Sequence, residues 1–155
     1  MAQFGRPISD VTVNDWTPTP LWSSLDEDPA SDADFISSNN NTNSACEVAL
    51  SAVTDPQSST GHIVRYRRRK SASGGNARDL TVLLLQGTTP IASTTHVNIT
   101  ETFTAGSFTL SSAAADAITD YSDLRIRFTS GGTIGGGGNV RRAVEVSWVA
   151  MEVPD

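Results

Sequence analysis

The sequence predicts an all-β protein: an antiparallel β-sandwich, jelly-roll-like, with an extended N-terminal arm and one short helix. Segments 62–70, 124–128 and 143–148 alternate apolar with polar residues, which places the two kinds of side chain on opposite faces of a strand. Further strand-like segments follow at regular spacing, with Gly, Pro, Asn and Ser between them. A hydrophobic fraction of 37% and a charged fraction of only 18% agree with a β protein that has many turns.

The length of 155 residues fits one domain with a hydrophobic core of its own. Residues 1–30 are predicted as an extended acidic arm, because four prolines in this stretch interrupt any regular strand ladder. Short extended pieces are expected at 11–16 and 21–25, with Trp16 and Trp22 anchoring the arm. Residues 31–155 are predicted as the single β-sandwich domain.

The strands of this domain are predicted from apolar segments that end at turn residues. The expected strands cover 34–37, 46–53, 61–70, 80–86, 90–97, 102–110, 124–129 and 140–153. One short helix is expected at 111–118, where Ser111 is a suitable N-cap and alanines follow. The last two strands are predicted to pair across a Gly-rich hairpin loop at 130–139. The expected core residues are Val64, Tyr66, Leu124, Ile126, Phe128, Val146 and Trp148.

No catalytic, metal or cofactor motif is found, so no enzymatic activity and no cofactor are predicted. Cys46 is alone and in phase with apolar neighbours, and His62 and His96 lack the partners that a zinc site or a general base needs. The glycines at 131–138 lead into a strand, whereas a phosphate loop leads into a helix. The acidic segment 26–34 is interpreted as a solvated loop, with a calcium site as the minor alternative.

The charge and the hydropathy of the chain exclude two classes of partner. The formal net charge of −6 argues against a general nucleic-acid binder. No segment approaches the apolar length of a membrane span, and residues 1–7 do not resemble a signal peptide, so synthesis in a cytoplasm is expected.

Arginines form the feature that most needs an explanation. Arg65, Arg67 and Arg69 share one side of their predicted strand, and Arg125 and Arg127 share the polar side of theirs. If these strands are neighbours, five guanidinium groups crowd one sheet face. Two interpretations remain open: an ordinary solvated face with local acidic partners, or an interface covered by an acidic segment of the arm or of another subunit. Trp16 and Trp22 are added to the arginines as predicted interface residues.

A saccharide-binding platform is a further alternative. Trp148, Tyr66 and Tyr121 are aromatic residues of the kind that carbohydrate-binding sandwiches use for stacking. Their phase favours the core for Trp148 and Tyr66, which leaves Tyr121 as the candidate.

Characteristic motifs lie at 55–70, 83–87, 118–128, 144–148 and 151–154, together with 6–11 and 16–18 near the start. With these motifs the chain resembles a group of small β-sandwich virion proteins of tailed bacteriophages. The resemblance implies a virion structural protein. We expect a capsid decoration (cement) protein that binds the major capsid protein or other virion proteins and forms homo-oligomers on the particle. A tail or receptor-binding, carbohydrate-binding module of the virion is the alternative.

Overall fold

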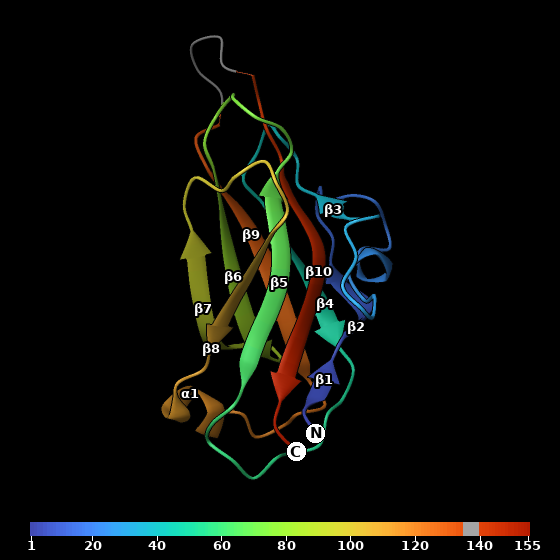
Figure 1. Cartoon of the computed structure of the whole chain (residues 1–155), viewed down its shortest axis with the longest axis vertical. Coiled ribbons are helices and arrows are strands. Elements are labelled where there is room, and N and C mark those ends of the chain that lie inside the picture. Colours follow the sequence, from blue (N-terminus) through green and yellow to red (C-terminus); the bar gives the residue numbers. More distant parts are fainter. Residues whose placement is uncertain (135–139) are drawn as a thin grey trace.

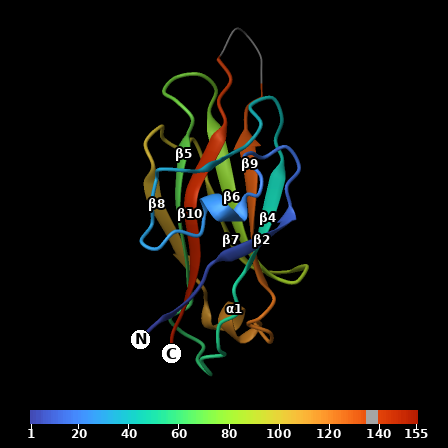
Figure 2. The same cartoon turned by 90° about the vertical axis from the view of Figure 1, so that its right-hand side faces the viewer.

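The computed structural model describes residues 1–134 and 140–155 and confirms the predicted class, an antiparallel β-sandwich of two sheets (Figure 1). In the first sheet the strands run in the order β1 (Gln3–Gly5), β10 (Val144–Val153), β5 (Ile63–Lys70) and β8 (Thr104–Thr109), and β3 (Ile36–Ser37) also pairs with β10. In the second sheet the order is β2 (Pro7–Thr12), β4 (Ala45–Leu50), β9 (Leu124–Gly132), β6 (Arg78–Gln86) and β7 (Thr89–His96). Figure 2 shows the two sheets side by side.

The predicted short helix is present as α1 (Ser112–Asp116). The side chain of Ser111 accepts a hydrogen bond from the Ala114 N–H, which is the N-cap interaction expected for this residue. The helix lies in the connection that takes the chain from β8 in the first sheet to β9 in the second.

The first residues of the chain belong to both sheets. β1 pairs with β10, and β2 pairs with β4, so that residues 3–12 add an edge strand to each sheet. Residues 13–35 then lie along the edge of the sandwich beside β10 and β2 and include one 3-10 turn, η1 (Trp22–Ser24), which packs against β2 (Figure 2). Trp16 has an exposed fraction of 1%, so it packs inside the core and anchors this segment.

Two predictions for the N-terminal segment were wrong in their details. The strand expected at 11–16 lies earlier, at Pro7–Thr12, where it pairs with β4. Residues 21–25 were expected to be extended but contain η1, because the carboxylate of Asp10 accepts hydrogen bonds from the backbone N–H groups of Leu21 (2.8 Å) and Trp22 (2.9 Å). This carboxylate acts on the turn as a capping residue acts on a helix.

The predicted pairing of the last two strands was also wrong. β9 lies in the second sheet and β10 in the first, so the segment between them connects the two sheets and is not a hairpin loop. Part of that segment, residues 135–139, lies outside the described residues.

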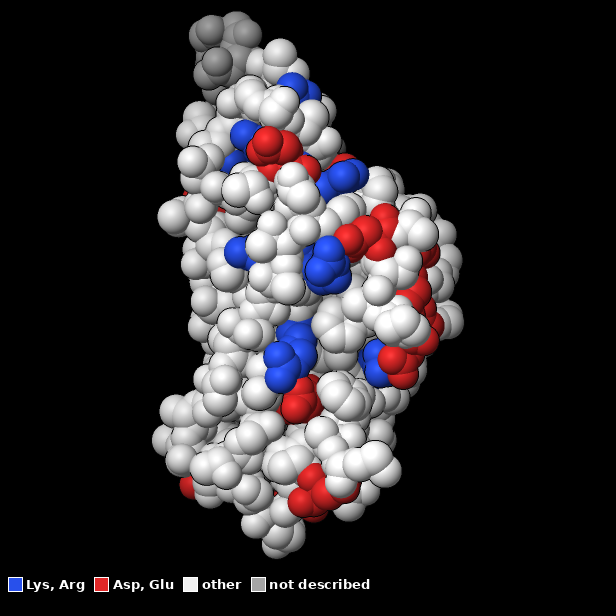
Figure 3. Space-filling model, in the orientation of Figure 1, with Lys and Arg blue, Asp and Glu red and all other residues white. Residues whose placement is uncertain are grey.

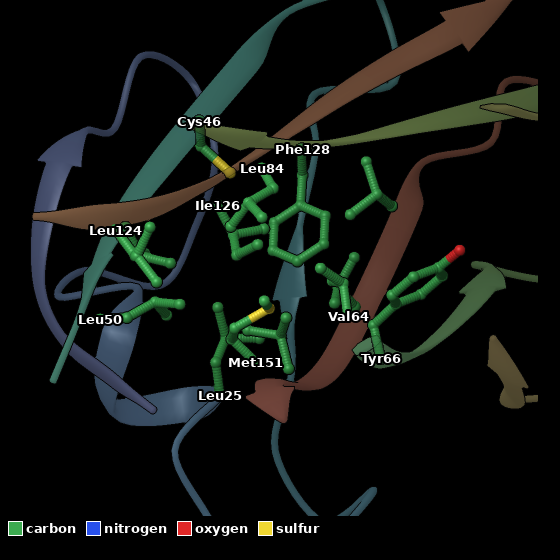
Figure 4. Close-up of a cluster of buried hydrophobic side chains, with 14 of the residues drawn as sticks. Leu25, Cys46, Leu50, Val64, Tyr66, Leu84, Leu124, Ile126, Phe128 and Met151 are labelled. Atoms are coloured by element: carbon green, nitrogen blue, oxygen red, sulfur yellow. The ribbon is translucent and has the colours of Figure 1, made fainter. Parts of the chain in front are cut away.

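The core lies between the sheets and is built from the inward-facing residues of both (Figure 4). Leu124, Ile126 and Phe128 project from β9 toward Val64 and Tyr66 of β5, as the alternation predicted. Trp148 is the exception among the predicted core residues. A β-bulge between Val146 and Trp148 reverses the phase of β10, so Trp148 is half-buried on the outer face of the first sheet.

Candidate binding groove on the first sheet

The predicted interface arginines do not form one surface. Arg65, Arg67 and Arg69 lie on β5 in the first sheet, whereas Arg125 and Arg127 lie on β9 in the second. The five guanidinium groups therefore do not crowd one face, because β5 and β9 belong to different sheets.

Each of these arginines has an acidic partner within the chain. Arg65 pairs with Glu152 on the neighbouring strand β10, and Arg69 pairs with Glu145 on the same strand, each at 2.5 Å. On the second sheet, Arg125 and Arg127 both contact the buried carboxylate of Glu47 on β4, at 3.6 and 2.9 Å. The solvated-face interpretation with local acidic partners thus describes these four residues.

Arg67 is closer to the second interpretation, because its partner belongs to the acidic segment 26–34, which begins in the predicted arm and ends just beyond it. Its Nε and Nη2 groups donate to the two carboxylate oxygens of Asp32 at 2.8 and 2.6 Å, a bidentate pair. The hydroxyl of Ser147 also donates to Asp32, and these bonds hold the pKa of the Asp32 carboxyl below its usual value, with the Arg67 bond as the largest cause. Figure 3 shows acidic side chains gathered on the flank where this segment lies, next to the basic side chains of the sheet.

Further contacts fix the same segment on the sheet. The indole Nε1 of Trp148 donates to the carbonyl oxygen of Glu27 at 2.7 Å, and Arg6 pairs with Asp28 at 2.8 Å. The guanidinium of Arg69 lies against the rings of Phe35 and Phe103, 4.9 and 4.2 Å from their centroids. The acidic segment 26–34 is therefore a cover over the outer face of β10 and β5.

The cover leaves a groove of about 270 Å³ on this face. Trp148 of β10, Arg65 and Arg67 of β5, and Ser107 of β8 line it, and Ala30 of the arm bounds it. Trp148 lies beside Arg67, its register partner on β5. An indole surface, two guanidinium groups and a hydroxyl thus meet in one shallow depression of the sheet.

The remaining residues that sequence analysis considered do not form a catalytic site. His62 is buried and shares a hydrogen bond with the Tyr121 hydroxyl at 2.7 Å, and burial lowers the pKa of His62. Cys46 is buried in the core, which raises the pKa of its thiol far above neutrality. Tyr121 is itself buried and is no stacking platform.

The alternative interpretation of the acidic segment 26–34 as a calcium site is not supported by the residues that the structure describes, 1–134 and 140–155. No group of three or more His, Cys, Asp or Glu side chains there is placed to hold a metal ion. Asp28 and Asp32 are instead engaged with Arg6 and Arg67. Likewise, no helix in the described part of the chain is long and apolar enough to cross a membrane.

Glu27 gives the cover a predicted pH dependence. Burial, and then the neighbouring Asp34 carboxyl, raise the pKa of Glu27 from 4.5 to about 7. A raised folded-state pKa means that the stabilisation is complete below pH 4.5 and is lost as the pH rises through about 7. We therefore expect the Tm of the wild-type protein to fall relative to that of Glu27→Gln as the pH is raised from 4.5 to 8.

The measurement is a pair of thermal unfolding series, one for each protein, followed by Trp fluorescence because Trp148 contacts Glu27 directly. The Glu27→Gln variant keeps the size and the backbone of the residue and removes only its titration. Two parallel Tm curves over this pH range would contradict the expectation.

No protein-family model matches the chain, and no curated protein shows significant similarity to it. Solved structures with a similar fold include a "Family 16 Carbohydrate Binding Module-2", at 13% identity and a TM-score of 0.42, which covers 90% of this chain and 92% of that one. TmCBM61 in complex with beta-1,4-galactotriose gives 8% identity and a TM-score of 0.44, over 99% of this chain and 88% of that one. A CBM4 structure gives 10% identity and a TM-score of 0.41, over 82% and 79%. Likenesses at this level concern the β-sandwich fold alone.

Proposed function

We propose that this protein is a non-catalytic saccharide-binding module and that its binding site is the groove around Trp148. The observation that carries the proposal is the outward position of Trp148, which the bulge in β10 brings next to Arg65 and Arg67. A half-buried indole on a sheet face is an apolar surface that a ligand can cover.

The groove offers what a sugar ring needs. A pyranose presents an apolar C–H face, which can pack on the indole, and hydroxyl groups around its rim, which both donate and accept hydrogen bonds. Among the described residues Arg65 bonds only through its Nε group, to Glu152, so its terminal nitrogens serve as donors, and the Glu152 carboxylate lies beside them as an acceptor. Ser107 adds a hydroxyl on the β8 side.

The same contacts argue for a neutral saccharide. The positive charges of Arg65 and Arg67 are offset by Glu152 and Asp32, so an anionic group would gain little there. The acidic segment 26–34 holds Trp148 and Arg67 in place through Glu27 and Asp32 before any ligand binds. Such preorganisation reduces the entropy lost on binding.

The support for this proposal comes from the groove itself. The solved carbohydrate-binding modules have TM-scores of 0.41–0.44 with this chain, too low for a ligand to be carried over from them. The size of the groove, about 270 Å³, fits part of an oligosaccharide, with the rest of the ligand in solvent.

Trp148→Ala tests the proposal. We expect it to weaken binding of neutral oligosaccharides about 10-fold or more, because the stacking surface is lost. Binding is measured by isothermal titration calorimetry, with ligands first found by screening the wild-type protein against neutral polysaccharides. Trp22→Ala is the matched control: Trp22 is also half-buried and packs against the core away from the groove, so its loss is expected to leave affinity unchanged.

Two results would overturn the proposal. One is a wild-type protein that binds none of the neutral polysaccharides in the screen. The other is a folded Trp148→Ala protein with the affinity of the wild type.

A second proposal is that the chain is a virion structural protein of a tailed bacteriophage, attached to the major capsid protein. The specific observation in its favour is apolar exposure along the two N-terminal edge strands. Phe4 on β1 and Ile8 and Val11 on β2 have exposed fractions of 40%, 53% and 42%. Edge strands with exposed apolar side chains are suited to contacts between chains. Quantitative mass spectrometry of purified particles tests it, since absence of the protein from virions would exclude this role.

A further inference from the structure

A second cavity lies at the open edge of the sandwich, where β7 of the second sheet and β8 of the first approach each other. Its volume is about 420 Å³, within the range of sites for small molecules. Arg68 of β5, His96 of β7 and Thr104 of β8 line it, together with the segment 95–100. It is separate from the groove around Trp148, which lies on the outer face of the first sheet.

Arg68 differs from the other arginines of β5 because it faces the inner side of the sheet. Its Nη1 donates to the carbonyl oxygens of Thr104 and Ala105 at 3.2 and 3.3 Å, and its Nη2 donates to Nδ1 of His96 at 3.0 Å. These are neutral acceptors, and no Asp or Glu is among the described residues that line the cavity. The positive charge is therefore not offset locally.

The guanidinium of Arg68 also keeps unused donors. Its Nε is buried without a hydrogen-bond partner among the described residues, and one hydrogen of Nη2 remains beyond the bond to His96. Burial lowers the pKa of Arg68, yet a guanidinium stays protonated in proteins. A charged donor without a partner favours the binding of an acceptor, and the buried Nε reaches one only if the side chain moves slightly.

Two further cations, Lys70 and Arg78, belong to the strands next to the cavity wall. Lys70 and Arg78 are both buried, and neither forms a salt bridge within the described ranges. Their backbones are bonded to the wall of the cavity: the Lys70 N–H donates to the Thr100 carbonyl at 2.7 Å, and the Ile99 N–H donates to the Arg78 carbonyl at 2.9 Å. Asp79 lies on the same wall, since its carboxylate accepts from the Asn98 N–H at 2.8 Å, so Arg68 is the one charged side chain among the described residues that line the cavity.

We propose that this cavity binds a small ligand that carries a carboxylate, such as a hexuronic acid, with Arg68 binding the carboxylate group. An arginine fork matches the geometry of a carboxylate. The rest of the lining suits a ring with several hydroxyls, because Thr95, Thr100 and Thr104 supply hydroxyl groups and Val97 and Ile99 supply apolar contacts. The cavity is also larger than an inorganic anion requires. This proposal does not depend on the saccharide groove.

The experiment is calorimetric titration of the full chain with sodium glucuronate, glucose and inorganic phosphate. We expect glucuronate to bind at least about 10-fold more tightly than glucose, since only glucuronate offers the charge-assisted hydrogen bonds to Arg68. The phosphate titration distinguishes a site for an inorganic anion from a site for a sugar carboxylate. Tighter binding of phosphate than of glucuronate would overturn the assignment of a carboxylate sugar. Equal affinity for glucuronate and glucose would overturn the role of Arg68.

Arg68→Gln and Arg69→Gln form a matched pair of variants, because both residues lie on β5, only Arg68 lines the cavity and Arg69 lines neither the cavity nor the groove. Arg68→Gln is expected to lose about 10-fold or more in glucuronate affinity and Arg69→Gln to retain it. Nuclear magnetic resonance of the wild-type chain decides the outcome if Arg68→Gln does not fold. Shifts induced by glucuronate at residues 95–104 would support the site, whereas shifts confined to the surroundings of Trp148, or no shifts, would refute it.

Discussion

Phe128→Ala is expected to lower the free energy of unfolding by about 3–5 kcal/mol, the range for truncation of a large aromatic residue in a core. Phe128 is fully buried, and its ring fills the centre of the cluster that joins the two sheets (Figure 4). On either side β9 pairs with β4 and β6, with Cys46 and Val82 as the register partners of Phe128. Strands hydrogen-bonded on both sides cannot easily move to fill the cavity that the substitution leaves.

Urea denaturation at 25 °C measures this loss. An m value equal to that of the wild type indicates that the two proteins expose the same surface on unfolding. Phe108→Ala is the control, because Phe108 is only partly buried and lies on the edge strand β8. Its loss is expected to be clearly smaller. Equal losses for the two variants would mean that Phe128 is not at the centre of the core.

The core could be predicted because the alternation of apolar and polar residues along one strand is a local property. Leu124, Ile126 and Phe128 alternate with Arg125 and Arg127, and the structure buries the apolar set as expected. The same rule holds along β5, where Val64 and Tyr66 face inward. Arg68 has the same inward phase in the structure, and its contact with His96 arises only because β5 and β7 come together at the edge of the sandwich.

The pairing of the strands could not be predicted, because it depends on contacts between distant segments. β5 and β9 carry similar patterns of arginines but lie in different sheets, and this separates the two arginine groups. The partner of Arg67 is Asp32, 35 residues away in the chain. Charge composition showed that an acidic arm and a basic strand exist, and only the fold brings them together.

The groove around Trp148 was missed for a different reason. Trp148 was considered for stacking but was assigned to the core, because it is in phase with Val144 and Val146 in an unbroken strand. One extra residue at the bulge in β10 reverses that phase. No turn residue such as Gly or Pro marks the bulge in the sequence between 144 and 150, so the pattern alone gave no signal for it.

Arg78→Met is expected to raise the free energy of unfolding by about 1–4 kcal/mol, the range seen when buried charged groups are replaced by apolar residues of similar volume. Arg78 faces the core on β6, in phase with Leu80 and Val82, and its exposed fraction is 0%. None of its three guanidinium nitrogens has a hydrogen-bond partner in the part of the chain that the structure describes. Folding therefore removes this charge from water without a replacement, whereas methionine would fill the space with no polar atoms.

Arg127→Met is also an arginine-to-methionine substitution, but it is expected to lower the free energy of unfolding. Arg127 binds the buried carboxylate of Glu47 at 2.9 Å, so its replacement leaves that carboxylate poorly paired and should destabilise the fold. Chemical denaturation of both variants and the wild type at 25 °C and neutral pH measures the two changes. If Arg78→Met destabilises the protein as Arg127→Met does, then the guanidinium of Arg78 is held by a bound ion or by water, and its burial stabilises the fold.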